Sequence, residues 1–144
     1  MDRRSHIARR VLAGAALLVV MTLTPMLAET AGAHAYYASS FTPGQCTWYA
    51  FHMRPDLAGS VWGNAGNWSA AARASGQPTG KVPRVHAVVV FQSGVQGAWR
   101  TGHVGYVTAV GANGTFRVSE MDFPIPGRVT SRWARSGRGV SFIY

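Results

Sequence analysis

One cysteine, one histidine and two carboxylates are the residues of this sequence whose types suit nucleophilic chemistry. Cys46 is the only cysteine in the chain, and His103, Glu120 and Asp122 follow it in two short segments. A thiolate attacks carbonyl carbon, and an imidazole held by a carboxylate can take the thiol proton and return it to a leaving amine. These residue types in this order favour amide chemistry by a cysteine nucleophile.

The same residues also have ordinary structural explanations. A free cysteine is most often a small buried hydrophobe, and His103 could be an ordinary strand-end histidine. Glu120 has apolar neighbours, where an unpaired carboxylate is costly, so we expect it to have a partner. That partner is either His103 or an arginine such as Arg100 or Arg117.

Two short helices are predicted ahead of the histidine. Segment 45–54 has aromatic residues at helical spacing and ends before a proline, which puts Cys46 in its first turn. A helix N-terminus favours a thiolate because of its partial positive charge. A second helix is expected over 68–74, capped by Asn67 and ended by Gly76.

The second half of the chain predicts strands. Segments 85–91, 103–110, 115–121 and 140–144 are rich in β-branched and aromatic residues, and the last would close the sheet. Helices followed by antiparallel strands predict an α+β fold, with the short helices packed on a small sheet. The basic stretch 128–138 is interpreted as a solvated surface segment.

The two central strands predict a hairpin whose register can be derived. A four-residue loop at 111–114 fixes the pairing. His103 then faces Asp122 and lies one diagonal from Glu120 on the same face. The remaining pairs are Val110 with Thr115, Val107 with Val118 and Ala109 with Phe116.

The start of the chain has the order of a secretory signal peptide. Arginines precede an apolar run over 11–21, and small residues follow as far as "AGAHA" at 31–35. A membrane anchor is the alternative, but the run is barely long enough to cross about 30 Å of hydrocarbon. We expect residues 1–33 to be removed near Ala33 or Ala35, and residues 34–144 to form a single secreted domain.

Residues 34–144 are strongly basic. They hold ten Lys and Arg side chains against three carboxylates, a net charge of +7. This charge favours polyanions, whether nucleic acid, anionic lipid or the acidic polymers of a bacterial wall. A nucleic-acid binder is an alternative that rests on charge alone, and without a recognised motif we expect no nucleic-acid partner.

Four stretches of the sequence resemble the CHAP domains. These are cysteine- and histidine-dependent amidohydrolases or peptidases of papain-like fold that cut bacterial peptidoglycan. The matching order and spacing cover nearly all of residues 34–144. The stretches are "GQCTWYA" at 44–50, "WGNAGNW" at 62–68, "GHVGYV" at 102–107 and "VSEMDF" at 118–123.

The resemblance implies a role for each candidate catalytic residue. Cys46 matches the nucleophile, His103 the general base, and Glu120 the acid that orients the histidine. Gln45 matches a position that helps the Cys46 backbone N–H stabilise an oxyanion. Asp122 stands where many relatives have asparagine, which would place two carboxylates beside one imidazole and raise its pKa or divide the orienting role.

The resemblance also bears on ligands. Trp62, Asn64 and Gly102 are candidates for substrate binding, although Trp62 and Trp68 could instead be core residues. Some relatives bind calcium through an acidic loop before the cysteine, but segment 34–45 contains no carboxylate. The histidines also lack zinc spacing, so we expect no metal and no cofactor.

The function implied by the resemblance is that of a secreted or wall-associated, monomeric peptidoglycan hydrolase with no stable membrane insertion. It would act as an endopeptidase or as an N-acetylmuramoyl-L-alanine amidase, and the sequence does not choose between these bonds. The alternative is a catalytically inactive CHAP-like module that binds the cell wall.

Overall fold

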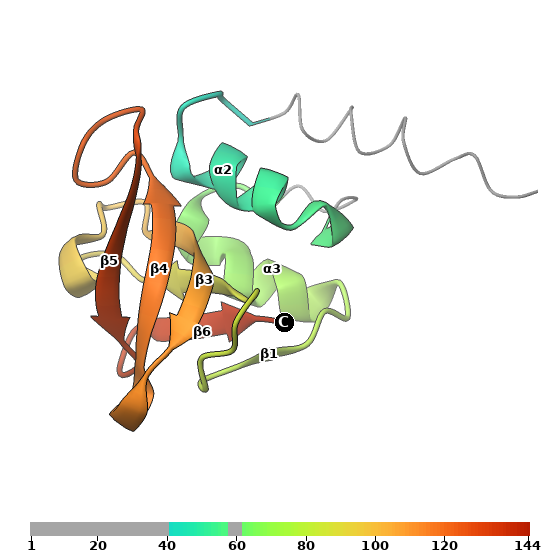
Figure 1. The fold of residues 1–144 in the computed structure, drawn as a ribbon. Coiled ribbons are helices and arrows are strands. Elements are labelled where there is room, and N and C mark those ends of the chain that lie inside the picture. The colour runs from blue at the N-terminus through green and yellow to red at the C-terminus, as the bar shows by residue number, and fades with distance from the viewer. Residues whose placement is uncertain (1–40, 58–61) are drawn as a thin grey trace, which may run out of the picture.

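A six-stranded antiparallel sheet carries the fold, and two short helices pack on one side of it (Figure 1). The computed structural model describes residues 41–57 and 62–144. The strands are β1 Thr79–Gly80, β2 Val88–Phe91, β3 His103–Val110, β4 Thr115–Met121, β5 Val129–Arg135 and β6 Val140–Ile143. The helices are α2 Cys46–Met53 and α3 Trp68–Ala74, with 3₁₀ turns at Pro55–Leu57, Ala65–Asn67, Val95–Gly97 and Ala112–Gly114.

The strand order in the sheet is β1-β6-β2-β3-β4-β5, which confirms the predicted α+β fold.

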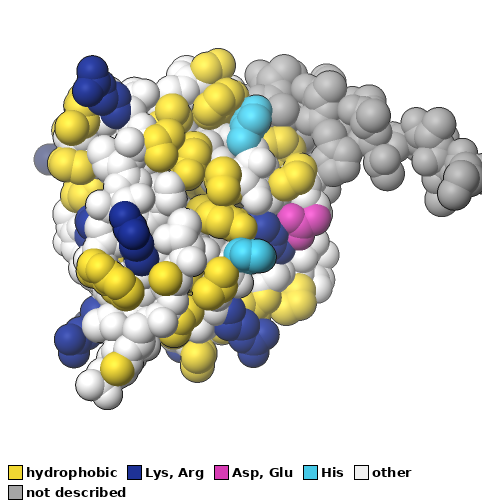
Figure 2. Space-filling model, in the orientation of Figure 1, with side chains coloured by type: hydrophobic (Ala, Val, Ile, Leu, Met, Phe, Trp, Pro, Cys, Tyr) yellow, Lys and Arg dark blue, Asp and Glu magenta, His cyan; other side chains and the backbone are white. Residues whose placement is uncertain are grey.

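The predicted signal peptide lies outside the described residues, so its cleavage remains a prediction. Among the residues that the structure describes, no helix is long and apolar enough to cross a membrane. Lys and Arg side chains are spread over the face seen in Figure 2, where acidic side chains are scarce.

Strand β2 lies at the centre of the sheet and is buried on both faces. Val88 and Val90 pack against the helices, whereas Val89 and Phe91 pack into a second apolar cluster on the opposite face. A strand buried on both sides needs a continuous apolar run rather than alternation. The predicted strand over 85–91 therefore shortens to its apolar part.

Helix α2 begins at Cys46, so the predicted place of the cysteine in the first turn is confirmed. Gly44, with φ +90°, turns the chain into the helix in a conformation that favours glycine. The Tyr49 hydroxyl hydrogen-bonds the Ser119 hydroxyl at 2.6 Å. This contact ties the cysteine-bearing helix to the residue next to Glu120.

Helix α3 has the predicted bounds, Trp68–Ala74. The predicted side-chain cap is wrong, because Asn67 is the last residue of a 3₁₀ turn and makes no capping bond. Gly76, with φ +77°, donates its N–H to the Arg73 carbonyl just after the helix.

The β3–β4 hairpin keeps the predicted register at the end that carries His103. Val107 pairs with Val118 as expected, but Ala109 pairs with Arg117 instead of Phe116. The register shifts between Val107 and Ala109, so β3 has one extra residue there, a β-bulge. Since the bulge lies toward the loop, the pairing near His103 is unaffected.

The C-terminal part bears out one prediction and overturns another. The basic stretch is exposed at the surface as expected, at Arg128, Arg135 and Arg138, although it also forms β5, which pairs along the whole of β4 from Met121–Val129 to Thr115–Arg135. Strand β6 does not close the sheet, since it lies between β1 and β2. Strand β5 lies at the edge of the sheet, and one of its faces is exposed at Val129, Ser131, Trp133 and Arg135.

Gly102 is predicted to be structurally irreplaceable. Its φ is +79°, and an added Cβ would lie 2.5 Å from the Gly66 nitrogen. We expect Gly102→Ala to lower the free energy of unfolding by about 3 kcal/mol in urea titration. Gly137→Ala is the control, because a Cβ there meets nothing within 4 Å. Equal stability of the two variants would contradict this packing.

Candidate active site

His103 and Glu120 form a buried pair across the hairpin. His103 Nε2 lies 3.0 Å from Glu120 Oε2. The histidine is 3% exposed and the carboxylate is fully buried. This contact confirms that the two side chains share one face of the sheet, as the hairpin register predicted.

Cys46 lies in the same cleft as His103, at the first residue of α2. Because Nε2 of His103 faces the carboxylate, Nδ1 is the ring nitrogen left for the cysteine side. Burial lowers the pKa of His103, but hydrogen bonds and charge interactions with Cys46 and Glu120 outweigh it and raise the pKa to about 9. The site therefore favours an imidazolium ion beside the sulfur.

The sign of this shift sets a pH window for stability. The pKa of His103 rises from 6.5 to about 9 on folding, so the folded state binds the proton more tightly. The contribution of the imidazolium to the free energy of unfolding is fully present below pH 6.5 and is lost as the pH rises through about 9.

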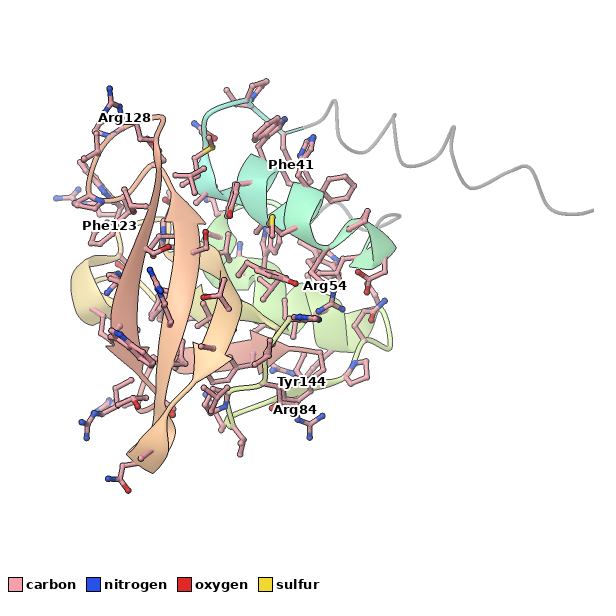
Figure 3. All side chains as sticks on the ribbon, in the orientation of Figure 1. Phe41, Arg54, Arg84, Phe123, Arg128 and Tyr144 are labelled. Atoms are coloured by element: carbon pink, nitrogen blue, oxygen red, sulfur yellow. The ribbon has the colours of Figure 1, made fainter. Side chains whose placement is uncertain are left out.

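Two phenylalanine rings flank the imidazole. The ring centroids of Phe91 and Phe123 lie 6.3 and 5.4 Å from that of His103. Phe123 belongs to the loop between β4 and β5 (Figure 3). These rings lie beside a pair that is almost fully shielded from water, and a low local dielectric strengthens its electrostatic interaction.

Arg132 on β5 is the second partner of Glu120. Its Nε donates to Glu120 Oε1 at 2.6 Å, and its guanidinium carbon lies 4.6 Å from the centre of the Phe123 ring. Glu120 therefore has both kinds of partner that the sequence offered, His103 and an arginine, but the arginine is neither Arg100 nor Arg117. The signal that could have found Arg132 is the alternation within 129–135, which places its side chain on the inward face.

The N-terminus of α2 opens into the cleft beside Cys46. Gln45 precedes the helix with extended backbone, makes no side-chain capping bond and is one of the residues that line the cleft. The first N–H groups of a helix have no intrahelical acceptor. Backbone donors and the Gln45 amide are thus available beside the sulfur.

The cleft has a volume of about 570 Å³ and includes Asn64 and Gly102 among its lining residues. The prediction that Trp62 lines it is wrong, because Trp62 is buried edge-to-face against Trp68 at 5.3 Å. Trp99, which the sequence reasoning missed, lines the cleft instead and is 70% exposed. The signal in the sequence that Trp99 lies near the site was its position four residues before His103.

The predicted sharing of the imidazole by two carboxylates is not seen, since Glu120 pairs with His103 and Asp122 makes no ion pair of 4 Å or less with it. The backbone of Asp122 turns away from the strand at φ +65°, and its Oδ1 accepts a hydrogen bond from the Gly127 N–H at 3.0 Å. The groups that raise the pKa of His103 are Cys46 and Glu120. Asp122 nevertheless lines the cleft.

No metal centre is formed within 41–57 and 62–144. No group of three or more His, Cys, Asp and Glu side chains in these ranges could hold a metal ion.

The cysteine lies at the start of a helix, and this helix packs on an antiparallel sheet that carries a histidine–carboxylate pair. This arrangement is a papain-like α+β fold. The chain belongs to the CHAP domain family, whose profile matches residues 36–122.

Two secreted antigens and two solved structures are similar to this chain. It is 43% identical to the staphylococcal secretory antigen ssaA2 of Staphylococcus aureus over 107 residues, which cover 72% of this chain and 38% of that protein. It is 40% identical to the antigen SsaA of the same species over 112 residues, 75% of this chain and 42% of that protein. The chain thus spans less than half the length of these curated relatives.

The more similar of these structures is an N-acetylmuramoyl-L-alanine amidase from Staphylococcus aureus, with a TM-score of 0.62 and 30% identity over 72% of this chain and 32% of that one. The structure of Ly7917 has a TM-score of 0.51 and 17% identity over 78% of this chain and 61% of that one, which shows the fold alone.

Arg132 is expected to stabilise the buried carboxylate. Arg132→Gln should lower the free energy of unfolding by about 3 kcal/mol at neutral pH, because it removes one partner of a buried charge. Arg135→Gln, an exposed change on the same strand, should alter it by less than about 0.5 kcal/mol. Similar losses in both variants, measured by urea unfolding, would show that Glu120 does not depend on Arg132.

Proposed function

We propose that this protein is a secreted peptidoglycan hydrolase that cleaves an amide bond through a cysteine thiolate. The observation that carries the proposal is the buried His103–Glu120 pair, 3.0 Å between Nε2 and Oε2, in the same cleft as Cys46. The family match and the amidase of similar fold support the substrate class. The signal-like order of residues 1–33 supports export, and the net charge of +7 on residues 34–144 supports attachment to an anionic wall.

Each group has a defined part in the proposed reaction. The Cys46 sulfur attacks the amide carbonyl carbon, and the oxyanion accepts hydrogen bonds from the Cys46 backbone N–H and the Gln45 amide. The His103 imidazolium then gives its proton to the leaving amine, and a thioester remains on Cys46. Water, deprotonated by His103, hydrolyses the thioester and restores the thiolate.

Glu120 acts on the reaction only through the ring of His103. Its carboxylate accepts the hydrogen bond from Nε2, which fixes the ring orientation and presents Nδ1 to the sulfur and to the leaving group. The scissile bond lies either within the peptide part of the wall or between muramic acid and its first alanine. The cleft shape, rather than these three side chains, decides between them.

Digestion of purified walls tests the proposal. The mature protein should release new amino termini that mass spectrometry identifies, and Cys46→Ala should release none. His103→Ala should slow release by at least about 10³-fold, because the proton relay is lost. His52→Ala is the matched control, since His52 is exposed on α2 and bonds only its own helix at the Trp48 carbonyl.

Two outcomes would contradict the proposal. If the wild type released no termini but still bound the walls, the chain would be an inactive wall-binding module. If Cys46→Ala retained activity, the cysteine would not be the nucleophile.

A further inference from the structure

The described residues contain three carboxylates, and two of them are neutralised by basic partners. Asp56 pairs with Arg54 at 2.6 Å, and Glu120 lies between His103 and Arg132. Asp122 makes no ion pair of 4 Å or less with any residue in 41–57 or 62–144. Among the described carboxylates, Asp122 is therefore the one whose negative charge has no basic partner within 4 Å.

Asp122 is also the one carboxylate among the described residues that line the cleft. It follows β4 directly, and its N–H donates to the Arg128 carbonyl at 3.1 Å. Oδ1 is occupied by the Gly127 N–H, whereas Oδ2 bonds no group of the described residues. Figure 3 shows the Arg128 side chain at the outer tip of the loop, pointing away from α2.

The loop does not need the negative charge of Asp122. An asparagine at this position would accept the same hydrogen bond from Gly127 through its amide oxygen. Asparagine also tolerates the left-handed backbone conformation, φ +65° here, at least as well as aspartate. The imidazole does not need the charge either, because Glu120 bonds His103 directly.

We infer that Asp122 determines specificity by binding a protonated primary amine of the substrate within the cleft. This inference rests on the proposed function, and it names a peptide that carries a free amine near the scissile amide. Primary amines are protonated at neutral pH. No other carboxylate lines the cleft within the described residues, so Asp122 is the carboxylate there that could bind such a cation.

The expected preference for the free amine over its acetylated form is small, because the cleft is open to water. A partly exposed ion pair contributes up to about 1 kcal/mol, which corresponds to about a fivefold preference for the free amine over its acetylated form. Asp122→Asn should remove most of that preference while keeping the Gly127 hydrogen bond. Asp56→Asn makes the same charge change outside the cleft and should keep the preference.

Hydrolysis and binding together test the inference. Purified walls, untreated or N-acetylated with acetic anhydride, are digested with wild type, Asp122→Asn and Asp56→Asn. In parallel, Cys46→Ala with and without Asp122→Asn is titrated calorimetrically with the tetrapeptide L-Ala-D-γ-Glu-L-Lys-D-Ala. The peptide is used free, Nε-acetylated and Nα-acetylated, so that a side-chain amine is distinguished from a terminal one.

The inference predicts that one acetylation weakens binding about fivefold and that Asp122→Asn abolishes this difference. Equal binding of all three peptides, or discrimination that persists in Asp122→Asn, would overturn it. If the wild type cleaves both kinds of wall equally, the inference fails while the proposed function stands. If neither wall is cleaved, the proposed function fails, and the binding measurements still decide the role of Asp122.

Discussion

The fully buried Glu120 carboxylate is the interaction on which the site depends. It bonds His103 at 3.0 Å on one side and Arg132 at 2.6 Å on the other. A lone carboxylate buried to this extent would be protonated or would destabilise the fold, since its desolvation is costly. Two basic partners make the ion tolerable there, and the rings of Phe91 and Phe123 shield the group from water. Interactions with Cys46 and with this carboxylate outweigh burial and raise the pKa of His103.

The rest of the fold brings a sulfur to that imidazole. Helix α2 begins at Cys46 and is held to β4 by the Tyr49–Ser119 hydrogen bond, one residue away from Glu120. Gly102 allows the backbone around Gly66 to pack closely at the start of β3, and the Gly66 N–H bonds the Thr101 carbonyl at 2.9 Å. Nucleophile, imidazole and carboxylate thus come from three elements that are joined by short contacts rather than by one flexible loop.

The sequence predicts the parts of this site that depend on local rules. Helix spacing places Cys46 correctly, and hairpin register pairs His103 with Glu120 because the bulge lies further along β3. The alternation within 129–135 indicates the inward face of Arg132, but its pairing with Glu120 could not be predicted, since β5 pairs along β4 only after a loop that carries no pairing signal. The prediction that Trp62 lines the cleft was wrong for a similar reason. Whether an aromatic side chain is buried or lines a cleft depends on tertiary packing, which its spacing in the sequence does not determine.

The titration of His103 tests the central claim most directly. With ¹⁵N-labelled histidine, NMR should show the ring of His103 losing its proton near pH 9, against an unfolded value of 6.5. The midpoint should fall in Cys46→Ala and in Glu120→Gln, because each change removes a group that stabilises the imidazolium. A midpoint near 6.5 that neither substitution moves would contradict an imidazolium held between this carboxylate and this sulfur.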